Sequence, residues 1–191
     1  FVPYDGAYKV GNEDLHPERS RTFDLSFKQM GANSYEITLF NNFIYDYFYY
    51  SSDGYENKGS FNSQGLEVSA SQKTKQVILK EGITLAKFDL SDDDEVLRRP
   101  EQKIDFNIDY NLTDKFKLNA HWKWIAARYD SASSQEVVMD AYDLTNISVR
   151  YQHFKNDYQL GINNLFDREY EDIAGYGTMG LTLFARANFN Y

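Results

Sequence analysis

The sequence predicts an all-β fold, an antiparallel sheet of the kind that forms transmembrane β-barrels. Three observations support this prediction: strands with alternating apolar and polar residues, connections that alternate between short turns and long loops, and a chain end that stays in phase to an aromatic residue. A period of two indicates a strand between two different media, because successive side chains point to opposite faces. Spanning a bilayer takes about nine to eleven tilted residues, and several of the alternating runs reach this length.

The clearest strand is the last one, expected over residues 178–191. Leu183, Phe189 and Tyr191 lie with other apolar residues on one face, and Arg186 and Asn188 lie on the other. A soluble domain usually lets its last residues fray, whereas this alternation continues to the final residue. It resembles the C-terminal targeting strand of bacterial outer-membrane barrels. Leu183, Phe189 and Tyr191 are therefore expected to form an assembly signal for the barrel-assembly machinery.

Further alternating runs precede this strand and predict a meander of about nine strands in all. They are expected at residues 22–30, 34–50, 61–72, 77–88, 103–112, 116–124, 147–152 and 158–164. The run at 77–88 has poor phase, because Glu81 shares its face with aliphatic residues. A β-bulge near Gly82, which would insert one extra residue, is one way to restore the phase.

Short and long connections alternate along the predicted meander. Tight turns are expected at Gly31, Thr74, Thr113 and Asn156, and long polar loops at residues 51–60, 89–99, 131–140 and 166–177. Transmembrane barrels have short periplasmic turns and long extracellular loops. We therefore expect the turns to be periplasmic and the loops to be extracellular.

The composition narrows the possible functions. The 191 residues carry a formal net charge of −9, which argues against a protein that binds nucleic acid. The chain has no cysteine, so a disulfide framework and a thiolate metal site are excluded. No apolar run is long enough for a transmembrane helix. The first residues, FVPYDG, do not resemble a signal peptide, so the leader of an outer-membrane protein is expected to have been removed or to lie in a longer chain.

Several motifs resemble those of TonB-dependent outer-membrane receptors. Residues 12–20, NEDLHPERS, are similar to the NPNL-x-PE-x-S stretch that precedes a barrel strand in this family. Residues 64–67, QGLE, resemble its K-G-[VL]-E strand, and residues 97–100, LRRP, resemble its L-x-R-R-P motif. Residues 163–170, NNLFDREY, resemble its near-terminal N-L-F-D-[KR]-x-Y motif. Together with the terminal strand, these matches follow the order of the family and cover nearly all of the chain.

The resemblance implies a barrel of about 22 strands with an N-terminal plug. The chain would supply about nine C-terminal strands of that barrel, with residues 1–20 as an extracellular loop and residues 21–191 as the meander, and nothing in it resembles the plug. The missing strands and plug would belong to the same parent chain or to a partner chain. Lipid cannot satisfy the backbone groups of a free strand edge, so both edge strands are expected to pair with further strands. Other implied partners are outer-membrane lipid and, through the plug, the inner-membrane energy-coupling complex.

The resemblance implies transport, with the chain located in the bacterial outer membrane. The expected function is energy-coupled import of a scarce large solute, such as a ferric siderophore, haem or cobalamin. Two alternatives stay open: a small stand-alone outer-membrane barrel with an adhesion or structural role, and a soluble all-β binding domain whose aromatic strands form a sandwich core. An odd number of strands weighs against the first alternative. No nucleophile–base pair, phosphate loop or pair of carboxylates indicates an enzyme, and no cofactor is expected.

Candidate substrate contacts come from loops and strand ends. His16 lies where haem-transporting members of the family can place a ligand, although an ordinary exposed loop residue is the simpler interpretation. Arg98 and Arg99 would attract an anionic iron chelate at the barrel mouth, or else pair with loop acids. Aromatic residues at the outer strand ends either belong to the interfacial belt or stack on the substrate; they are Tyr129, Tyr142, Tyr170 and Tyr176.

The interfacial aromatic belt is also expected to include Trp122, Trp124, Tyr45 and Tyr47. No metal site is predicted. The histidines, among them His121 and His153, show no metal-binding spacing. The acidic run at residues 92–95 lacks the glycine and the spacing of a calcium loop and is expected to be solvated.

Overall fold

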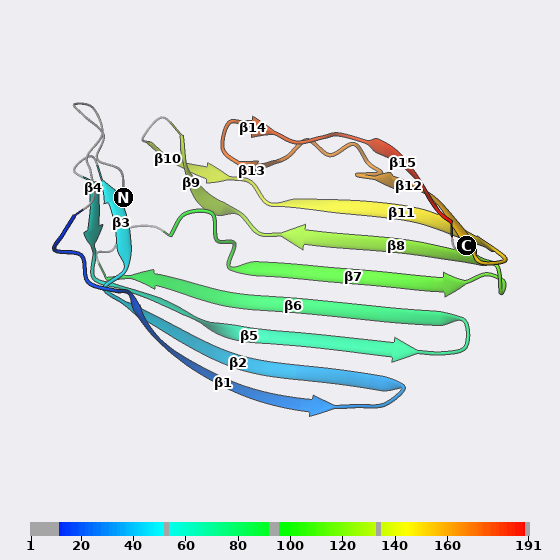
Figure 1. Cartoon of the computed structure of the whole chain (residues 1–191), viewed down its shortest axis with the longest axis horizontal. Coiled ribbons are helices and arrows are strands. Elements are labelled where there is room, and N and C mark those ends of the chain that lie inside the picture. Colours follow the sequence, from blue (N-terminus) through cyan, green and yellow to red (C-terminus); the bar gives the residue numbers. More distant parts are fainter. Residues whose placement is uncertain (1–11, 52–53, 92–95, 133–134, 190–191) are drawn as a thin grey trace.

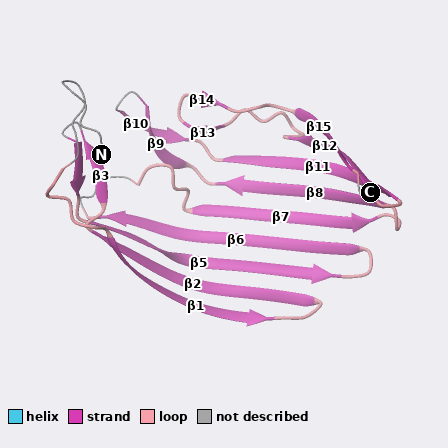
Figure 2. Ribbon diagram, in the orientation of Figure 1, coloured by secondary structure: helices cyan, strands magenta, loops and turns pink. Residues whose placement is uncertain are grey.

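A computed structural model of the 191-residue chain describes residues 12–51, 54–91, 96–132 and 135–189. The regular structure in these ranges consists of strands alone (Figure 2). A helix that could cross a membrane is therefore not found in the described part of the chain.

The main sheet contains nine strands in chain order, and each strand is antiparallel to its neighbours (Figure 1). The strands are β1 (Arg19–Gln29), β2 (Asn33–Tyr45), β5 (Ser60–Lys73), β6 (Val77–Leu90), β7 (Gln102–Asn111), β8 (Phe116–Ile125), β11 (Tyr142–His153), β12 (Asn156–Asn163) and β15 (Thr182–Asn188). The predicted meander of about nine strands is confirmed.

Short hairpins occupy three of the long loops, where the sequence predicts only polar loops. They pair β3 (Phe48–Ser51) with β4 (Gly54–Asn57), β9 (Arg128–Ala132) with β10 (Gln135–Met139), and β13 (Glu171–Ile173) with β14 (Tyr176–Gly177). All three hairpins stand at one end of the sheet, and the tight turns lie at the other end (Figure 1).

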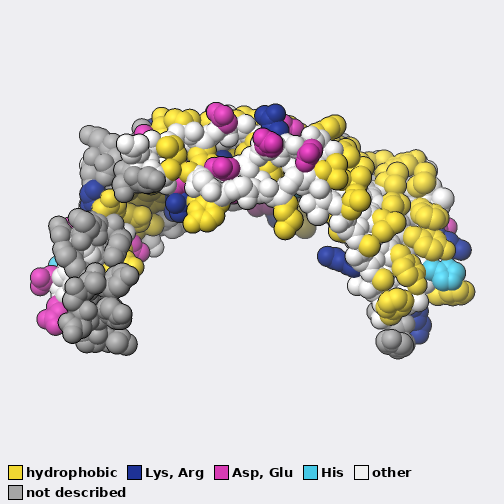
Figure 3. Space-filling view, turned by 90° about the horizontal axis from the view of Figure 1, so that it is seen from above, with side chains coloured by type: hydrophobic (Ala, Val, Ile, Leu, Met, Phe, Trp, Pro, Cys, Tyr) yellow, Lys and Arg dark blue, Asp and Glu magenta, His cyan; other side chains and the backbone are white. Residues whose placement is uncertain are grey.

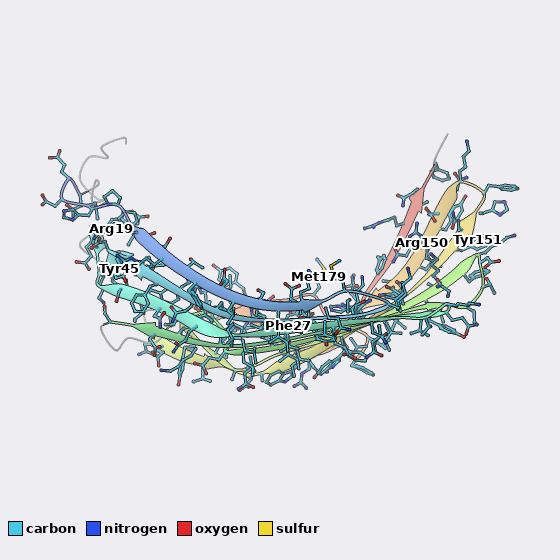
Figure 4. The ribbon with its side chains drawn as sticks, turned by 90° about the horizontal axis from the view of Figure 1, so that it is seen from below. Arg19, Phe27, Tyr45, Arg150, Tyr151 and Met179 are labelled. Atoms are coloured by element: carbon cyan, nitrogen blue, oxygen red, sulfur yellow. The ribbon has the colours of Figure 1, made fainter. Side chains whose placement is uncertain are left out.

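The strand register separates apolar from polar side chains. Between β7 and β8, Ile108 lies opposite Ala120, whereas the neighbouring Asn107 lies opposite His121. The sheet bends into an arch, with an outer face and a hollow (Figure 3). Arg150 points into the hollow, whereas Tyr151, which stacks on Phe116 at 4.7 Å between ring centroids, lies on the outside (Figure 4). We refer to the polar side as the hollow face and to the apolar side as the outer face.

No second layer of the described chain covers the outer face. Phe23, Leu25 and Phe27 in β1 are 65%, 58% and 61% exposed, and Leu183 in β15 is 71% exposed. A soluble sandwich would bury this face against a second sheet. The buried apolar residues of the described chain lie elsewhere, at the loop end of the sheet; they are Phe61, Met139, Tyr142 and Leu144.

The predicted strand at residues 34–50 is interrupted. β2 ends at Tyr45, and Asp46 adopts a φ of 56° that leads the chain away from the sheet. A carboxylate oxygen of Asp46 lies 2.6 Å from Nη2 of Arg19, which holds this bend. The ring of Tyr47 then packs against Phe61, with 6.1 Å between the centroids, and does not continue in phase with Tyr45.

The end of the meander also differs from the prediction. β15 begins at Thr182, because residues 178–181 bond to the preceding loop: the Thr178 hydroxyl donates to the Tyr170 carbonyl at 2.7 Å, and the Leu181 amide donates to Asp167 at 2.6 Å. Residues 190 and 191 lie outside the described ranges, so Tyr191 of the predicted assembly signal is not placed.

β11 starts earlier than the predicted run at residues 147–152, at Tyr142. Tyr142 and Leu144 lie on the hollow face, yet they are buried, with exposures of 5% and 6%. Loop hairpins cover this end of the hollow face, so apolar residues replace the polar ones there. The simple alternation is therefore lost over the first residues of the strand.

The prediction of a β-bulge near Gly82 is wrong. β6 pairs with β5 and β7 without a register shift, with Glu81 opposite Ala70 on one side and Phe106 on the other. A Cβ added at Gly82 would find its nearest neighbour at 3.8 Å, so nothing in the packing requires glycine at this position. Glu81 therefore lies on the apolar outer face.

Two other glycines lie beneath aromatic rings on the hollow face. A Cβ added at Gly65 would lie 2.1 Å from the carbonyl oxygen of Leu85 and 2.7 Å from the ring of Phe40, which faces it across the strand pair. In the same way, a Cβ at Gly161 would lie 2.5 Å from the ring of its partner Phe184. An aromatic ring over a cross-strand glycine fills the space that a side chain would otherwise occupy.

Replacing Gly65 with Ala is expected to destabilise the sheet by about 1–3 kcal/mol, because the backbone of β6 must move to admit the Cβ. Gly82→Ala in the neighbouring strand is the control. It is expected to be neutral or stabilising by up to about 1 kcal/mol, because alanine restricts the unfolded chain. Urea unfolding of protein refolded in detergent micelles measures both. Equal unfolding free energies for the two variants would contradict the close approach at Gly65.

Candidate functional site: a junction of three loops

Three connections meet at the loop end of the sheet (Figure 1). They are the β6–β7 connection, the β9–β10 hairpin and the β13–β14 hairpin. Leu97 forms a parallel bridge with Tyr129, and the Arg98 amide donates to the Tyr129 carbonyl at 2.6 Å. The side chains that hold these connections together form what we name the loop junction: Arg98, Arg128, Asp130, Tyr142 and Asp172.

Asp130 is the centre of the loop junction. Its side chain is fully buried, and one carboxylate oxygen accepts hydrogen bonds from Nε of Arg98 at 2.6 Å and from the Ser131 amide at 2.7 Å. The other oxygen accepts a hydrogen bond from the Ala174 amide at 2.8 Å. One carboxylate therefore joins all three connections. Burial of a charge is tolerated only when it is paired and hydrogen-bonded in this way.

The surroundings of Asp130 set its protonation. Burial alone raises its pKa, but the hydrogen bonds from Ala174, Arg98 and Ser131 outweigh burial and bring the pKa below the ordinary value of 3.8. A carboxyl group whose folded pKa is lowered stabilises the fold above its unfolded pKa. The stabilisation by Asp130 is therefore complete above about pH 4 and is lost as the pH falls through the lower folded pKa.

Arg128 makes a second tie between the hairpins. Its side chain is only 4% exposed, and Nη2 donates to the carbonyl oxygens of Glu171 at 2.9 Å and Asp172 at 3.1 Å. The guanidinium carbon lies 5.6 Å from the ring centroid of Tyr142, whose hydroxyl donates to the Asp172 carboxylate at 2.6 Å. The Tyr142 ring in turn contacts Tyr170, with 4.5 Å between the centroids.

The NNLFDREY motif builds the support of the β13–β14 hairpin. Asn164 and Asp167 adopt φ values of 52° and 50°, a conformation that Asn and Asp tolerate better than most residues. The buried side chain of Asn164 binds both backbone groups of Arg168: Nδ2 donates to the carbonyl and Oδ1 accepts from the amide, each at 2.8 Å. The motif is thus a structural turn that fixes where the hairpin leaves the sheet.

A cavity of about 870 Å³ lies between β10, the start of β11 and the loop at residues 167–180. Cavities of this size accommodate small organic molecules. The charged residues in its lining are Asp140, Asp167, Arg168, Glu169 and Glu171. With four carboxylates and one guanidinium, this lining favours hydrogen-bond donors and positive charge over anions.

The two predicted arginines are engaged within the protein. Arg98 pairs with Asp130, as described above, and the guanidinium of Arg99 lies over the rings of Phe61 at 4.9 Å and Phe88 at 5.8 Å. The sequence left two roles open for Arg98, attraction of an anion or pairing with a loop acid. The contact with Asp130 favours the second role.

The predicted tyrosines have different environments. Tyr142 is buried in the loop junction, whereas Tyr129 is 36% exposed and Tyr176, in β14, is 72% exposed. His16 acts through its backbone, which donates to Oδ1 of Asn57 at 2.7 Å and accepts from Nδ2 of the same residue at 2.9 Å. These bonds fasten the segment before β1 to β4.

The remaining predicted residues lie on the sheet. Trp122 and Trp124 belong to the outer face of β8, and the indole nitrogen of Trp122 donates to Asp143 at 3.3 Å. Phe189 is 58% exposed, and its ring meets Tyr158 edge-on at 6.1 Å. On the hollow face, Nε2 of His121 lies 3.1 Å from a carboxylate oxygen of Asp105. His153 packs edge-on against Phe154 at the turn end, with 4.5 Å between the ring centroids.

Within the described ranges, no group of His, Cys, Asp or Glu side chains could hold a metal ion. The acidic run at residues 92–95 lies outside the described residues.

Sequence reasoning missed Arg128 and Asp130. The available signal was their spacing, because alternation through Arg128, Tyr129 and Asp130 places two opposite charges on one face of a strand. That this face is the covered one is known only from the structure, in which Arg128 and Asp130 are buried and Tyr129 is 36% exposed.

Asp130→Asn is expected to loosen all three connections together, because the neutral side chain no longer pairs with Arg98. Amide hydrogen exchange should quicken at residues 97–99, 128–131 and 171–175, while the strands of the main sheet keep their protection. Asp140→Asn, an exposed acid in the cavity lining, is the control and should leave exchange unchanged. Acidification of the wild type should reproduce the loosening only below pH 3.8. Faster exchange in the β9–β10 hairpin alone would contradict the shared role.

Comparison with known proteins identifies the architecture. Residues 2–165 match the family model described as TonB dependent receptor-like, beta-barrel. The ferric-catecholate import receptor Fiu from E. coli K12, in its closed form, aligns with a TM-score of 0.76 at 21% identity, over 92% of this chain and 28% of that one. The siderophore receptor PirA from Acinetobacter baumannii aligns with a TM-score of 0.75 at 19% identity, over 92% and 32% of the two chains.

A third structure is the ferripyoverdine receptor of the outer membrane of Pseudomonas aeruginosa, bound to ferripyoverdine. It aligns with a TM-score of 0.76 at 15% identity, over 88% of this chain and 27% of that one. At such identities the structural likeness establishes the fold alone, and the chain spans less than a third of each of these structures. The family match covers most of the sequence. The chain therefore belongs to the TonB-dependent receptor family, and its fold is that of the family's β-barrel.

Proposed function

We propose that this chain forms barrel wall and extracellular loops of an energy-coupled outer-membrane receptor that imports a scarce large solute, such as a ferric siderophore, haem or cobalamin. The observation that carries the proposal is the curved meander of a TonB-dependent receptor, with a polar hollow face, turns at one end and folded loops at the other. Two of the similar structures are receptors for ferric catecholates and ferripyoverdine, which favours an iron chelate.

The remaining barrel strands and the plug come from the parent chain or from a partner chain. In the described sheet β1 pairs with β2 alone and β15 with β12 alone, so each outer edge presents free backbone groups. Lipid cannot satisfy these groups, and further strands on both edges would. A closed barrel of about eight strands leaves room for side chains or one small ligand, too little for a bulky chelate. The small stand-alone barrel is therefore not favoured.

The apolar outer face is the surface that meets outer-membrane lipid. Trp122, Trp124 and Tyr45 would belong to the interfacial aromatic belt, whereas the contact of Tyr47 with Phe61 sets Tyr47 apart from it. Leu183 and Phe189, with Tyr191, would be read by the barrel-assembly machinery. Transport would start with binding at the extracellular loops and proceed by rearrangement of the plug, driven by the inner-membrane energy-coupling complex.

The loops contribute to solute binding in two ways. Tyr129 and Tyr176 keep exposed rings that can stack on a solute. Arg98, Arg99 and Tyr142 act indirectly, because their contacts set the shape of the loops and of the acidic cavity. The backbone of His16 fastens the segment before β1 to β4, and His16 stays a candidate contact of the solute.

The membrane orientation is tested by a pair of arginine substitutions in β7. Phe106→Arg on the outer face is expected to destabilise the receptor by about 2–4 kcal/mol if it lies near the bilayer midplane. Asn107→Arg, one residue away on the hollow face, should have little effect. Urea titrations of the parent receptor in lipid vesicles measure both. Equal effects would contradict the orientation.

Topology and transport are tested together with single cysteines, which the chain otherwise lacks. Gly175→Cys, in the β13–β14 turn, should react with a bulky impermeant maleimide on intact cells, and the adduct should block uptake of the ferric siderophore. Asp114→Cys, in a tight turn, should react only after the outer membrane is permeabilised, and uptake should persist. Labelling of Asp114→Cys on intact cells would show that the topology is the reverse of the one proposed. Unimpaired uptake after labelling at Gly175→Cys would argue against a role of this loop in transport.

A further inference from the structure

Glu81 lies at the centre of the outer-face stretch of β6 that runs from Val77 to Leu85. The outer-face residues on both sides of it along the strand are aliphatic, namely Val77, Leu79, Ile83 and Leu85. The next outer-face residue toward the loop end is Lys87. Under the proposed orientation, the Glu81 carboxylate therefore lies near mid-depth in the bilayer, between two stretches that face lipid.

The register leaves Glu81 no route to the hollow face. Its partners Ala70 and Phe106 belong to continuous ladders on both sides, which run over the full contact of β6 with β5 and β7. A shift by one residue would move every side chain of β6 to the wrong face. The backbone pairing of β6, and not the conformation of one flexible side chain, therefore places Glu81 on the outer face.

In the described part of the chain, no residue forms a hydrogen bond or an ion pair with Glu81, so none neutralises its charge. The outer-face cation on the same strand, Lys87, is six positions away, about 20 Å along an extended strand. Lys80 is adjacent in sequence but points to the opposite face. A cation that pairs with Glu81 therefore has to come from outside these strands.

Ionisable groups within membranes are rare, and they pair with one another or mark a functional contact. A charged side chain on the lipid face of a barrel is destabilising, most of all near the midplane. A cationic side chain at the same depth offsets this penalty by pairing with the carboxylate. Lipid head groups carry amines, but they lie at the membrane surface, away from the centre of β6.

A second copy of this segment does not supply the cation. The outer-face arginines and lysines of the described strands, which are Arg19, Arg21 and Lys87, lie toward the loop ends of β1 and β6. Two copies that met through β6 would bring the two Glu81 carboxylates toward each other. The complementary chemistry therefore belongs to a different surface.

We propose that Glu81, with Ala70 and Phe106 on either side, is a docking surface for another membrane-embedded protein that presents a Lys or Arg side chain at mid-depth. The short side chain of Ala70 leaves room beside the carboxylate for close approach of the partner's backbone. This inference rests on the proposed membrane orientation but goes beyond transport, since it assigns the receptor a lateral partner.

The experiment places a photo-crosslinking amino acid at Ile83, next to Glu81 on the outer face, in the parent receptor within its native membrane. The control position is Leu160, an outer-face residue of β12 that is 60% exposed. A protein adduct is expected at Ile83 and not at Leu160. Glu81→Gln should reduce the adduct at least tenfold, because the amide keeps the shape but loses the charge.

Peptide sequencing of the adduct should locate a Lys or Arg in a membrane-spanning segment of the partner. Exchanging the charges, with Glu81→Lys in the receptor and Glu at that partner position, should restore the adduct. The inference is overturned by an adduct that persists in Glu81→Gln, by one formed only with lipid or with a second receptor, by a partner segment without a cation, or by no adduct at Ile83.

A second measurement separates docking from a role in the receptor's own fold. In purified receptor, in vesicles without the partner, Glu81→Leu should raise the urea midpoint, because a charge no longer faces lipid. A lower midpoint would show that Glu81 stabilises the receptor itself. Equal effects of Phe106→Arg and Asn107→Arg on stability would contradict both the membrane orientation and this inference. Unequal effects without an adduct at Ile83 would remove this inference alone.

Discussion

Backbone hydrogen bonding between antiparallel neighbours is the constraint on which the other features of this molecule depend. Each inner strand of the main sheet pairs with the strands before and after it in the sheet, and each edge strand pairs with one neighbour. The position of a residue along its strand therefore decides which face it occupies. The same ladder fixes the polar hollow face and the apolar outer face. It also forces the chain to reverse direction at every strand end, which gathers the tight turns at one end and the longer connections at the other.

The loops are held by contacts of a different kind, made by buried side chains and not by the backbone ladder. The described residues form no layer over the outer face, and the buried ones gather where the hairpins fold back over the start of β5 and β11. Without disulfides, this region relies on buried charges: both carboxylate oxygens of Asp130 accept hydrogen bonds, and Nη2 of Arg128 donates to two backbone carbonyls. The low-dielectric setting strengthens such bonds and makes their loss costly. Long connections therefore behave as a folded layer in their own right.

The sequence predicts the sheet well because alternation is a local property. β7 and β8 show it over residues 103–111 and 116–124, and their predicted bounds agree with the structure to within a residue or so. The misses occur where distant contacts override the local pattern. Asp46 ends β2 because Arg19 holds its bend, and the start of β11 turns apolar because a hairpin covers it.

The loop junction was beyond sequence reasoning for the same reason. Asp130 bonds to residues 32 and 44 positions away, and nothing near it in the sequence marks these partners. The bulge expected near Gly82 failed differently. An acidic residue on an apolar face predicts a shifted register, but the register is continuous and Glu81 lies on the outer face. Local anomalies of this kind are expected at functional positions.

The ring of Phe184 over Gly161 has a consequence for how the sheet is built. Ser148, Gly161 and Phe184 face one another across β11, β12 and β15, and a Cβ at Gly161 would lie 2.8 Å from the Cβ of Ser148 and 2.5 Å from the aromatic ring. The seat of the ring is thus made by two strands, and it exists only once β12 has joined β11. A residue larger than glycine at position 161 would have to displace Phe184 or Ser148, so it would disturb the contacts of β12 with β15 and with β11 together.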